Sequence, residues 1–260
     1  MPSPPGQSVE AFRMRRPLRS GGMRAPAAAI LGEGPVAAET ARRLRAARPG
    51  RLVMPFDAQG PVDVLVVCDP RPAVIADAAL WAARVCPFTV IVIAARGGLE
   101  LCARALRASG LAPGLIMSTG AMPRALSEAA TLARSLDVCV SQVCVCAIGG
   151  DSVADTRVLD RYTAVAGIPA TQMTPQPASR PPAREASDAD LGRSAAALAI
   201  AVLQDRRQVF CCGAWVEGAF GLPGGYVSVP VRVGARGAEE PIPLRLTLDE
   251  RAVLQRSLRD

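Results

Sequence analysis

Short apolar runs alternate with amphipathic stretches along the first half of the chain. Strand-sized apolar runs stand at residues 27–31, 51–54, 62–68, 89–94 and 115–117. The stretches between them place apolar residues at helical spacing, which predicts helices ending near residue 48 and spanning 75–85, 99–109 and 124–136. Strands and helices in regular alternation predict a Rossmann-like parallel sheet with helices on both faces.

The pattern changes in the second half. A longer strand is expected at 138–147, and a Pro-rich loop at 171–193, where four prolines exclude a continuous helix. A helix at 194–204 and strands at 208–218, 225–233 and 242–246 follow, the first two antiparallel around a Gly-rich turn. Thr247, Asp249 and Glu250 supply the cap and first-turn acids of a terminal helix. We therefore expect an α/β protein whose C-terminal part is α+β with antiparallel strands.

These patterns divide the chain into three parts. Residues 1–26 predict a disordered or targeting tail, 27–137 a Rossmann-like nucleotide-binding domain, and 138–260 a C-terminal domain. The tail is rich in arginine but lacks the apolar core of a secretory signal, so we expect a cytoplasmic protein. A transit peptide directing the chain to the mitochondrial matrix is the alternative.

The composition limits the chemistry. The 260 residues include no histidine, lysine or asparagine, and all thirty basic residues are arginine. The formal charge is +7, but the arginines are scattered, which indicates a coding bias rather than a nucleic-acid surface. The apolar runs are strand-sized, so no membrane span is expected. The side chain best suited to proton exchange near neutral pH is absent from the whole chain.

Eight cysteines occur, mostly in apolar stretches and without C-x-x-C spacing. Cys144 and Cys146 alternate along the strand expected at 138–147 and would share one of its faces. Without histidine, a zinc site would need four thiolates or carboxylates. Reduced core cysteines and no metal site are the better interpretation.

One motif predicts a cofactor. The first strand runs into Gly32-x-Gly34-x-x-Ala37 and then a helix, which is the dinucleotide fingerprint in its Ala-ending form. Asp57 lies twenty residues beyond Ala37, about where a carboxylate would hold the adenine ribose. Gly32, Gly34, Ala37 and Asp57 are therefore the candidate NAD-binding residues. Pro35 removes one N–H from the turn, and a scaffold that no longer binds nucleotide is the alternative.

The C-terminal third resembles bacterial-type malate dehydrogenases. The resemblance is carried by Arg161–Pro169 (RYTAVAGIP), by 205–221, which includes VFCCGAWVEGAFG, and by GYVSVPV at 225–231 and LRLTLDER at 244–251. It covers roughly residues 26–260, with gaps, and points to the lactate/malate dehydrogenase family. The resemblance implies NAD as cofactor and a dimer or tetramer.

The family's working residues have no counterparts at the matching positions. Its Gly-x-His-Gly-Asp motif falls on residues 147–151, which places Gly149 where the catalytic histidine is expected. Its Thr-Asn-Pro asparagine falls at residues 95–97, and its Leu-Asp-x-x-Arg carboxylate is missing from residues 120–124. The family's mobile loop is nearly absent after residues 68–72. We therefore assign no catalytic residue, and Arg124 receives no role. Cys144, Cys146 and Asp151 are the conceivable substitutes for the base.

Three functions follow as hypotheses. The first is a catalytically silent, malate-dehydrogenase-like scaffold or binding subunit, which pairs with itself or with a homologous dehydrogenase. The second is an NAD-dependent malate or 2-hydroxy-acid dehydrogenase of altered mechanism. The third is an NAD-sensing regulator that keeps the fingerprint and has lost the chemistry.

Overall fold

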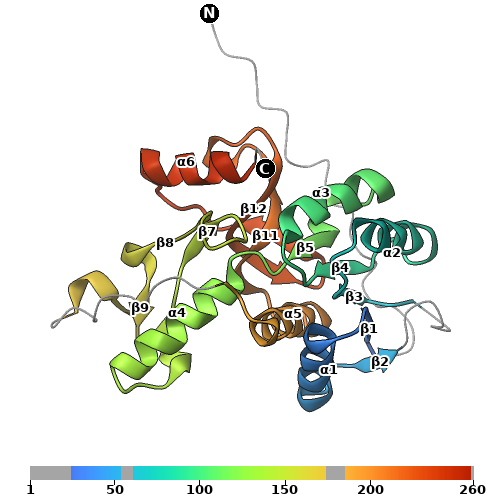
Figure 1. The fold of residues 1–260 in the computed structure, drawn as a ribbon, viewed down its shortest axis with the longest axis horizontal. Helices are drawn as coiled ribbons and strands as arrows, with labels where there is room; N and C mark the ends of the chain where they lie inside the picture. The colour runs from blue at the N-terminus through green and yellow to red at the C-terminus, as the bar shows by residue number, and fades with distance from the viewer. Residues whose placement is uncertain (1–24, 54–60, 174–184, 259–260) are drawn as a thin grey trace, which may run out of the picture.

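The computed structural model describes residues 25–53, 61–173 and 185–258 and contains one large mixed sheet. Its ten strands follow the order β2-β1-β3-β4-β5-β11-β12-β7-β8, with β13 paired to β12 (Figure 1). The first five strands are parallel: β1 (Ala27–Leu31), β2 (Arg51–Val53), β3 (Val64–Val67), β4 (Val90–Ile93) and β5 (Ile116–Ser118).

Helices cover both faces of the parallel strands, as the sequence predicted. The helices of this half are α1 (Pro35–Ala47), α2 (Pro72–Val85), α3 (Gly98–Ser109) and α4 (Met122–Ser135). Strand β3 is buried throughout, with Val64 and Val66 in one core and Leu65 and Val67 in the other. The first core includes residues of α1 and of α5 (Asp188–Leu203), and the second includes residues of α2 and α3. Two buried faces explain why this strand is apolar at every position.

The C-terminal strands continue the same sheet in antiparallel fashion. They are β7 (Ala147–Gly149), β8 (Thr156–Val158), β11 (Gln208–Val216), β12 (Gly225–Gly234) and β13 (Gly237–Pro241). Strand β11 pairs with β12 along its whole length and with β5 at Gly213 and Ser118. The sheet therefore crosses the expected domain boundary at residue 137, and the division into two domains remains a prediction.

A second sheet has three short strands, β6 (Val143–Cys144), β9 (Ala164–Val165) and β10 (Ile168–Pro169). Short 3-10 turns stand at Pro113–Leu115, Val140–Gln142, Asp160–Tyr162, Ala170–Gln172 and Ala219–Gly221. The last helix is α6 (Leu248–Ser257). Among the residues described here, no helix is long and apolar enough to cross a bilayer.

The single strand expected at 138–147 is wrong. A 3-10 turn occupies Val140–Gln142, β6 covers only Val143–Cys144, and β7 begins at Ala147. The break arises because β6 pairs with β9 in the small sheet, whereas β7 pairs with β8 and β12 in the large one. As a result Cys144 is exposed and Cys146 is buried, so the two do not share a face.

The helix expected at 194–204 begins six residues earlier, at Asp188. Ser187 is its N-cap: the Ser187 hydroxyl accepts from the Asp190 N–H, and the Asp190 carboxylate accepts from the Ser187 N–H. This capping box satisfies two free N–H groups and fixes the start of the helix. The loop expected at 171–193 is therefore shorter at its C-terminal end, and residues 174–184 lie outside the described part of the chain.

The strand expected at 242–246 is also wrong. The edge strand is β13 at Gly237–Pro241, which forms a hairpin with β12 through the turn between Gly234 and Gly237. Gly234 and Gly237 enclose a two-residue turn, a short loop that is typical of a β-hairpin. The chain therefore reverses before residue 237, and the returning strand ends before residue 242. The terminal helix is as predicted, with Thr247 and Glu250 forming its capping box.

Candidate functional site

The predicted cofactor turn lies between β1 and α1 at the carboxyl edge of the parallel strands. Gly32 has φ +112° and Gly34 has φ +92°, values that favour glycine. A Cβ at Gly32 would lie 3.1 Å from the Asp69 nitrogen, so the turn packs closely on the end of β3. A Cβ at Gly34 would have no described atom within 4 Å. The turn is therefore closed toward the sheet at Gly32 and open at Gly34.

The first turn of α1 offers N–H groups at this opening. Gly34 is the N-cap, no side chain caps the helix, and no acidic residue stands in its first turn. Ala38 is the first residue whose N–H bonds back to the helix, to the Gly34 carbonyl at 3.0 Å. Pro35 has no N–H, which leaves those of Val36 and Ala37 at the positive end of the helix dipole. Such an end suits a phosphate group.

The carboxylate expected to complete the cofactor site is not placed. Asp57 lies outside the described residues, so the structure brings together only Gly32, Gly34 and Ala37. The connection from β2 to β3, residues 54–63, is ten residues long. A crossover that contains its own helix requires about a dozen residues or more. At the nearby end of β3, the Asp69 carboxylate is bound by the Arg71 guanidinium, with a shortest N–O distance of 2.6 Å. The Arg71 guanidinium holds the pKa of Asp69 below its usual range.

The junction between β4 and α3 is crossed by the segment that precedes α5. Arg96 donates to the Ala186 carbonyl at 2.9 Å and pairs with the Asp188 carboxylate at 3.4 Å. The N–H of Val153 approaches the Glu185 carboxylate at 3.4 Å. Residues 185–188 therefore lie between the end of β4 and the loop after β7, two places that are far apart in the sequence.

Gly149 ends β7 in a conformation that only glycine adopts readily. Its φ is +114°, and a Cβ there would lie 2.1 Å from the Asp155 carbonyl oxygen and 2.8 Å from Val253 Cγ1. The following residue is fixed as well, because the Gly150 N–H donates to the Asp155 carbonyl at 2.9 Å. The Gly150 carbonyl accepts from the hydroxyls of Thr156 and Ser228. No side chain fits at Gly149 without displacing this hairpin.

The Asp151 carboxylate is bound to the start of α3. It accepts from the Leu99 N–H at 3.1 Å, at the N-terminal turn of a helix whose N-cap, Gly97, has no side chain to offer. Burial raises the pKa of Asp151, and the N–H groups of Leu99, Asp151 and Gly98 oppose that rise. Space around the carboxylate is limited, since a Cβ at Gly98 would lie 2.9 Å from Ser118 Cβ and 3.4 Å from the Asp151 oxygen. Asp151 thus caps a helix.

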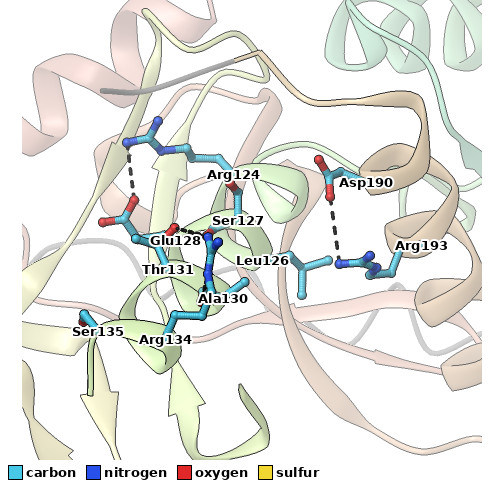
Figure 2. Close-up of a pocket in the computed structure, with 10 residues that line it drawn as sticks. All are labelled: Arg124, Leu126, Ser127, Glu128, Ala130, Thr131, Arg134, Ser135, Asp190 and Arg193. Atoms are coloured by element: carbon cyan, nitrogen blue, oxygen red, sulfur yellow. Dashed lines mark hydrogen bonds and ion pairs between the residues drawn. The ribbon is translucent and has the colours of Figure 1, made fainter. Parts of the chain in front are cut away.

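A groove of about 660 Å³ runs along α4 and the start of α5. In Figure 2, Arg124 and Glu128 point toward one another at one end, and Asp190 and Arg193 face them from α5. The ion pairs are loose, at 3.6 Å for Arg124–Glu128 and 3.9 Å for Arg193–Asp190. None of the predicted cofactor residues lines this groove, which the sequence reasoning missed because its two helices are distant in the chain.

The structure also brings Cys211 of β11 close to the link between β6 and β7, which the sequence left apart. The Cys211 sulfur accepts from the Ala147 N–H at 3.3 Å, and its S–H donates to the Val145 carbonyl at 3.8 Å, on either side of Cys146. Within the described residues, no group of three or more Cys, Asp or Glu side chains could hold a metal ion, and the expectation of no metal site remains a prediction.

Comparison with known proteins decides the family. No family model matches the chain. It is 34% identical over 191 residues to the malate dehydrogenase of Thermomicrobium roseum, covering 68% of this chain and 61% of that protein. It is 35% identical over 141 residues to the malate dehydrogenase of Salinibacter ruber, covering 48% of this chain and 44% of that protein. The matched part of the chain therefore spans less than two thirds of either relative.

Solved structures agree on the fold. The lactate dehydrogenase of Eimeria maxima, solved with NADH and oxamate, superposes with a TM-score of 0.80 at 16% identity, over 92% of this chain and 94% of that one. The apo malate dehydrogenase of Picrophilus torridus gives 0.78 at 18% identity, over 90% and 94%. This chain belongs to the lactate/malate dehydrogenase family. The predicted family is thus confirmed, together with the Rossmann-like fold and its antiparallel C-terminal strands.

Proposed function

We propose that this protein is a catalytically silent member of the lactate/malate dehydrogenase family that serves as a scaffold or binding subunit. The observation that carries the proposal is the backbone at Gly149, which stands where the resemblance places the catalytic histidine. Its positive φ and the 2.1 Å approach to the Asp155 oxygen leave no room for an imidazole. This closed backbone supports a role in which residue 149 takes no part in proton transfer.

The remaining proton-transfer candidates are occupied in other ways. Asp151 binds the α3 N-terminus through the Leu99 N–H, and a general base needs its carboxylate directed at a substrate proton. The neighbouring Cys211 thiol, together with burial, raises the pKa of the Cys146 thiol. Cys144 is exposed, and burial of part of its side chain also raises its pKa. Without an acid–base group, hydride transfer to the carbonyl carbon of a 2-oxo acid has no proton donor for the carbonyl oxygen, and the reverse reaction has no base to take that proton away.

The cofactor turn fits a pyrophosphate better than the rest of the site fits a substrate. Gly34 is open, and α1 presents the N–H groups of Val36 and Ala37. The nicotinamide cofactor, when bound, would carry the hydride of the family reaction, which NADH donates to a 2-oxo acid and NAD accepts from a 2-hydroxy acid. At the nicotinamide end the family's asparagine is replaced within Ala95-Arg96-Gly97, and Arg96 turns to Ala186 and Asp188. We therefore propose that NAD binding, where it occurs, is uncoupled from turnover.

The test is turnover of oxaloacetate and NADH by the purified protein, followed by the loss of NADH absorbance. An active malate dehydrogenase at equal subunit concentration is the positive control. A mock purification from the same host measures contaminating enzyme. We expect a rate no higher than that of the mock sample, because loss of one acid–base group alone costs a factor of about 10²–10⁴. A rate comparable to that of the active enzyme would refute the proposal.

An NAD-sensing regulator is the second candidate, and the open position at Gly34 favours it. Calorimetry with NAD at millimolar concentration tests binding directly. If NAD raises the melting temperature, Gly34→Leu should abolish that rise, since the side chain would occupy the opening. Gly218→Leu is the matched control, because Gly218 also has positive φ and no described atom within 4 Å of its Cβ position. A rise unchanged in Gly34→Leu would place the nucleotide elsewhere.

The partners follow from the same proposal. A silent subunit with an intact fold is suited to pairing with a second copy or with a homologous dehydrogenase in the cytoplasm. Size-exclusion chromatography with light scattering, alone and after mixing with an active homologue, measures both kinds of assembly. A monomer in both experiments would leave the scaffold role without support.

A further inference from the structure

The groove along α4 and α5 brings together three guanidinium groups from two helices that are distant in the chain. Arg124 and Arg134 belong to α4, and Arg193 belongs to α5. Two carboxylates, those of Glu128 and Asp190, also line the groove, so its side chains carry a net charge of +1. Its volume of about 660 Å³ falls within the range of small-molecule sites, about 300–1,000 Å³. The groove is therefore weakly positive and large enough for a small ligand.

The Arg193 guanidinium is incompletely bonded within the described residues. Its Nη1 atom stands 3.9 Å from the Asp190 carboxylate, which is beyond hydrogen-bond distance. Its Nε atom is buried and has no hydrogen-bond partner in the described part of the chain. The Asp190 carboxylate is bound by the N–H and the hydroxyl of Ser187. A buried donor without an acceptor costs free energy, so an anion to which this guanidinium turned would stabilise it.

Arg124 makes a similarly loose contact. Only 18% of its side chain is exposed, and its ion-pair partner Glu128, one turn further along α4, lies 3.6 Å away. The same spacing gives a contact of 2.6 Å between Glu100 and Arg104 on α3. The acid comes first in that pair, whereas the arginine comes first on α4, an order that favours ion pairs less. The Arg124 guanidinium therefore retains donors for a ligand in the groove.

We propose that this groove binds a small polyanion, a molecule with more than one carboxylate or phosphate group, through the guanidinium groups of Arg124 and Arg193. A planar guanidinium donates in pairs to the oxygens of either group. Figure 2 shows the arginines at separate places around the groove, Arg124 and Arg134 on α4 and Arg193 across from them on α5. Separate groups of one ligand therefore meet separate arginines. No residue of the cofactor turn lines the groove, so this site goes beyond the proposed function and does not depend on it.

The buried carboxylates of the groove limit how tightly an anion binds. The side chains of Glu128 and Asp190 are only 8% and 9% exposed, so dissolved salt screens their charges little. Both charges repel an anion in the groove. Glu128→Gln removes one of them and keeps the shape of the side chain. We therefore expect this variant to bind a polyanion more tightly than the wild type, a gain that a damaged fold cannot produce.

Titration calorimetry of the full-length protein tests the site. Sodium pyrophosphate and tricarballylate are the polyanions, and sodium phosphate and acetate are the single-group controls, in a low-salt buffer free of these ions. We expect saturable binding of a polyanion, tighter than that of the matching single-group ion. The tighter of the two polyanions identifies the ligand chemistry as phosphate or carboxylate. No saturable heat from either polyanion at millimolar concentration would overturn the proposal.

Substitution of the arginines locates the binding. Arg193→Gln and Arg124→Gln should each raise the dissociation constant by about ten- to a hundredfold, the loss expected for one charge-assisted contact. Arg104→Gln is the matched control, because it removes the same charge from an exposed ion pair on α3 and should leave the constant nearly unchanged. Equal weakening in Arg104→Gln would mean that net charge alone attracts the anion, and would refute the site. Melting temperatures measured without anion check that each variant is folded.

The cofactor turn is the competing anion site, since the N-terminus of α1 also suits a phosphate group. Gly34→Leu fills the opening of that turn and should leave pyrophosphate binding in the groove intact. Binding that survives in Arg193→Gln but is lost in Gly34→Leu would assign the anion to the cofactor turn and overturn the proposal. These results are separable from the test of catalytic silence, because that assay follows only the loss of NADH.

Discussion

Replacement of Gly149 by alanine tests the idea that the backbone at residue 149 is closed to a side chain. The substitution adds one methyl group at a buried position with φ +114°. That methyl group would meet the Asp155 carbonyl oxygen at 2.1 Å and Val253 Cγ1 at 2.8 Å. The first neighbour is backbone in the β7–β8 hairpin and the second belongs to α6, so both must move.

The expected cost has two parts. A non-glycine residue in such a backbone conformation costs about 1–3 kcal/mol. Forcing an extra methyl group into a packed site costs about 1–3 kcal/mol more. We therefore expect a loss of about 2–6 kcal/mol in the free energy of unfolding, which for a chain of this size lowers the melting temperature on the order of 10 °C.

Gly167→Ala separates these parts. Gly167 has φ +82°, but no described atom lies within 4 Å of its Cβ position, so only the backbone cost remains. Urea unfolding followed by circular dichroism compares both variants with the wild type. Gly149→Ala should be the less stable by about 1–3 kcal/mol. Equal stabilities would refute the steric account, and with it the main support for a closed catalytic position.

Three further predictions concern stability. Ser187→Ala removes the cap of α5 and should cost about 1 kcal/mol in urea unfolding; no change would mean that the capping box does not set the start of the helix. Glu250→Gln should cost about 2 kcal/mol at neutral pH, because the Glu250 carboxylate binds Arg161 through two contacts of 2.5 Å. The Arg161 guanidinium lowers the pKa of Glu250 to about 2 from 4.5, so its contribution is complete above pH 4.5 and is lost as the pH falls toward 2. The gap between wild type and Glu250→Gln should narrow over that window, and a constant gap would contradict the ion-pair explanation. Gly192→Ala should destabilise by about 1–2 kcal/mol, since its Cβ would lie 2.8 Å from the Val36 carbonyl oxygen at the α1–α5 crossing; a more stable variant would show that the two helices separate easily.

Much of the fold could be predicted from local sequence because its causes are local. The apolar run around β3 is bounded by turn residues and fills two cores, and such a run has few alternatives to a buried strand. Thr247 and Glu250 cap α6 within four residues of each other. The glycines at 32 and 34 adopt the positive φ that their fingerprint requires. The errors at 138–147 and 242–246 arose where pairing partners, rather than composition, set the strand ends.

By itself the sequence determined the alternating α/β plan, the family resemblance and the absence of any imidazole from the chain. Only the tertiary structure decided how the residues of the 147–151 segment are packed. It closed the backbone at Gly149 against Asp155, turned Asp151 into a helix cap, and placed the Cys211 sulfur beside Cys146, 65 positions earlier in the chain. Contacts of this kind join residues whose spacing carries no periodic signal, because they depend on how the sheets and helices pack after each has formed.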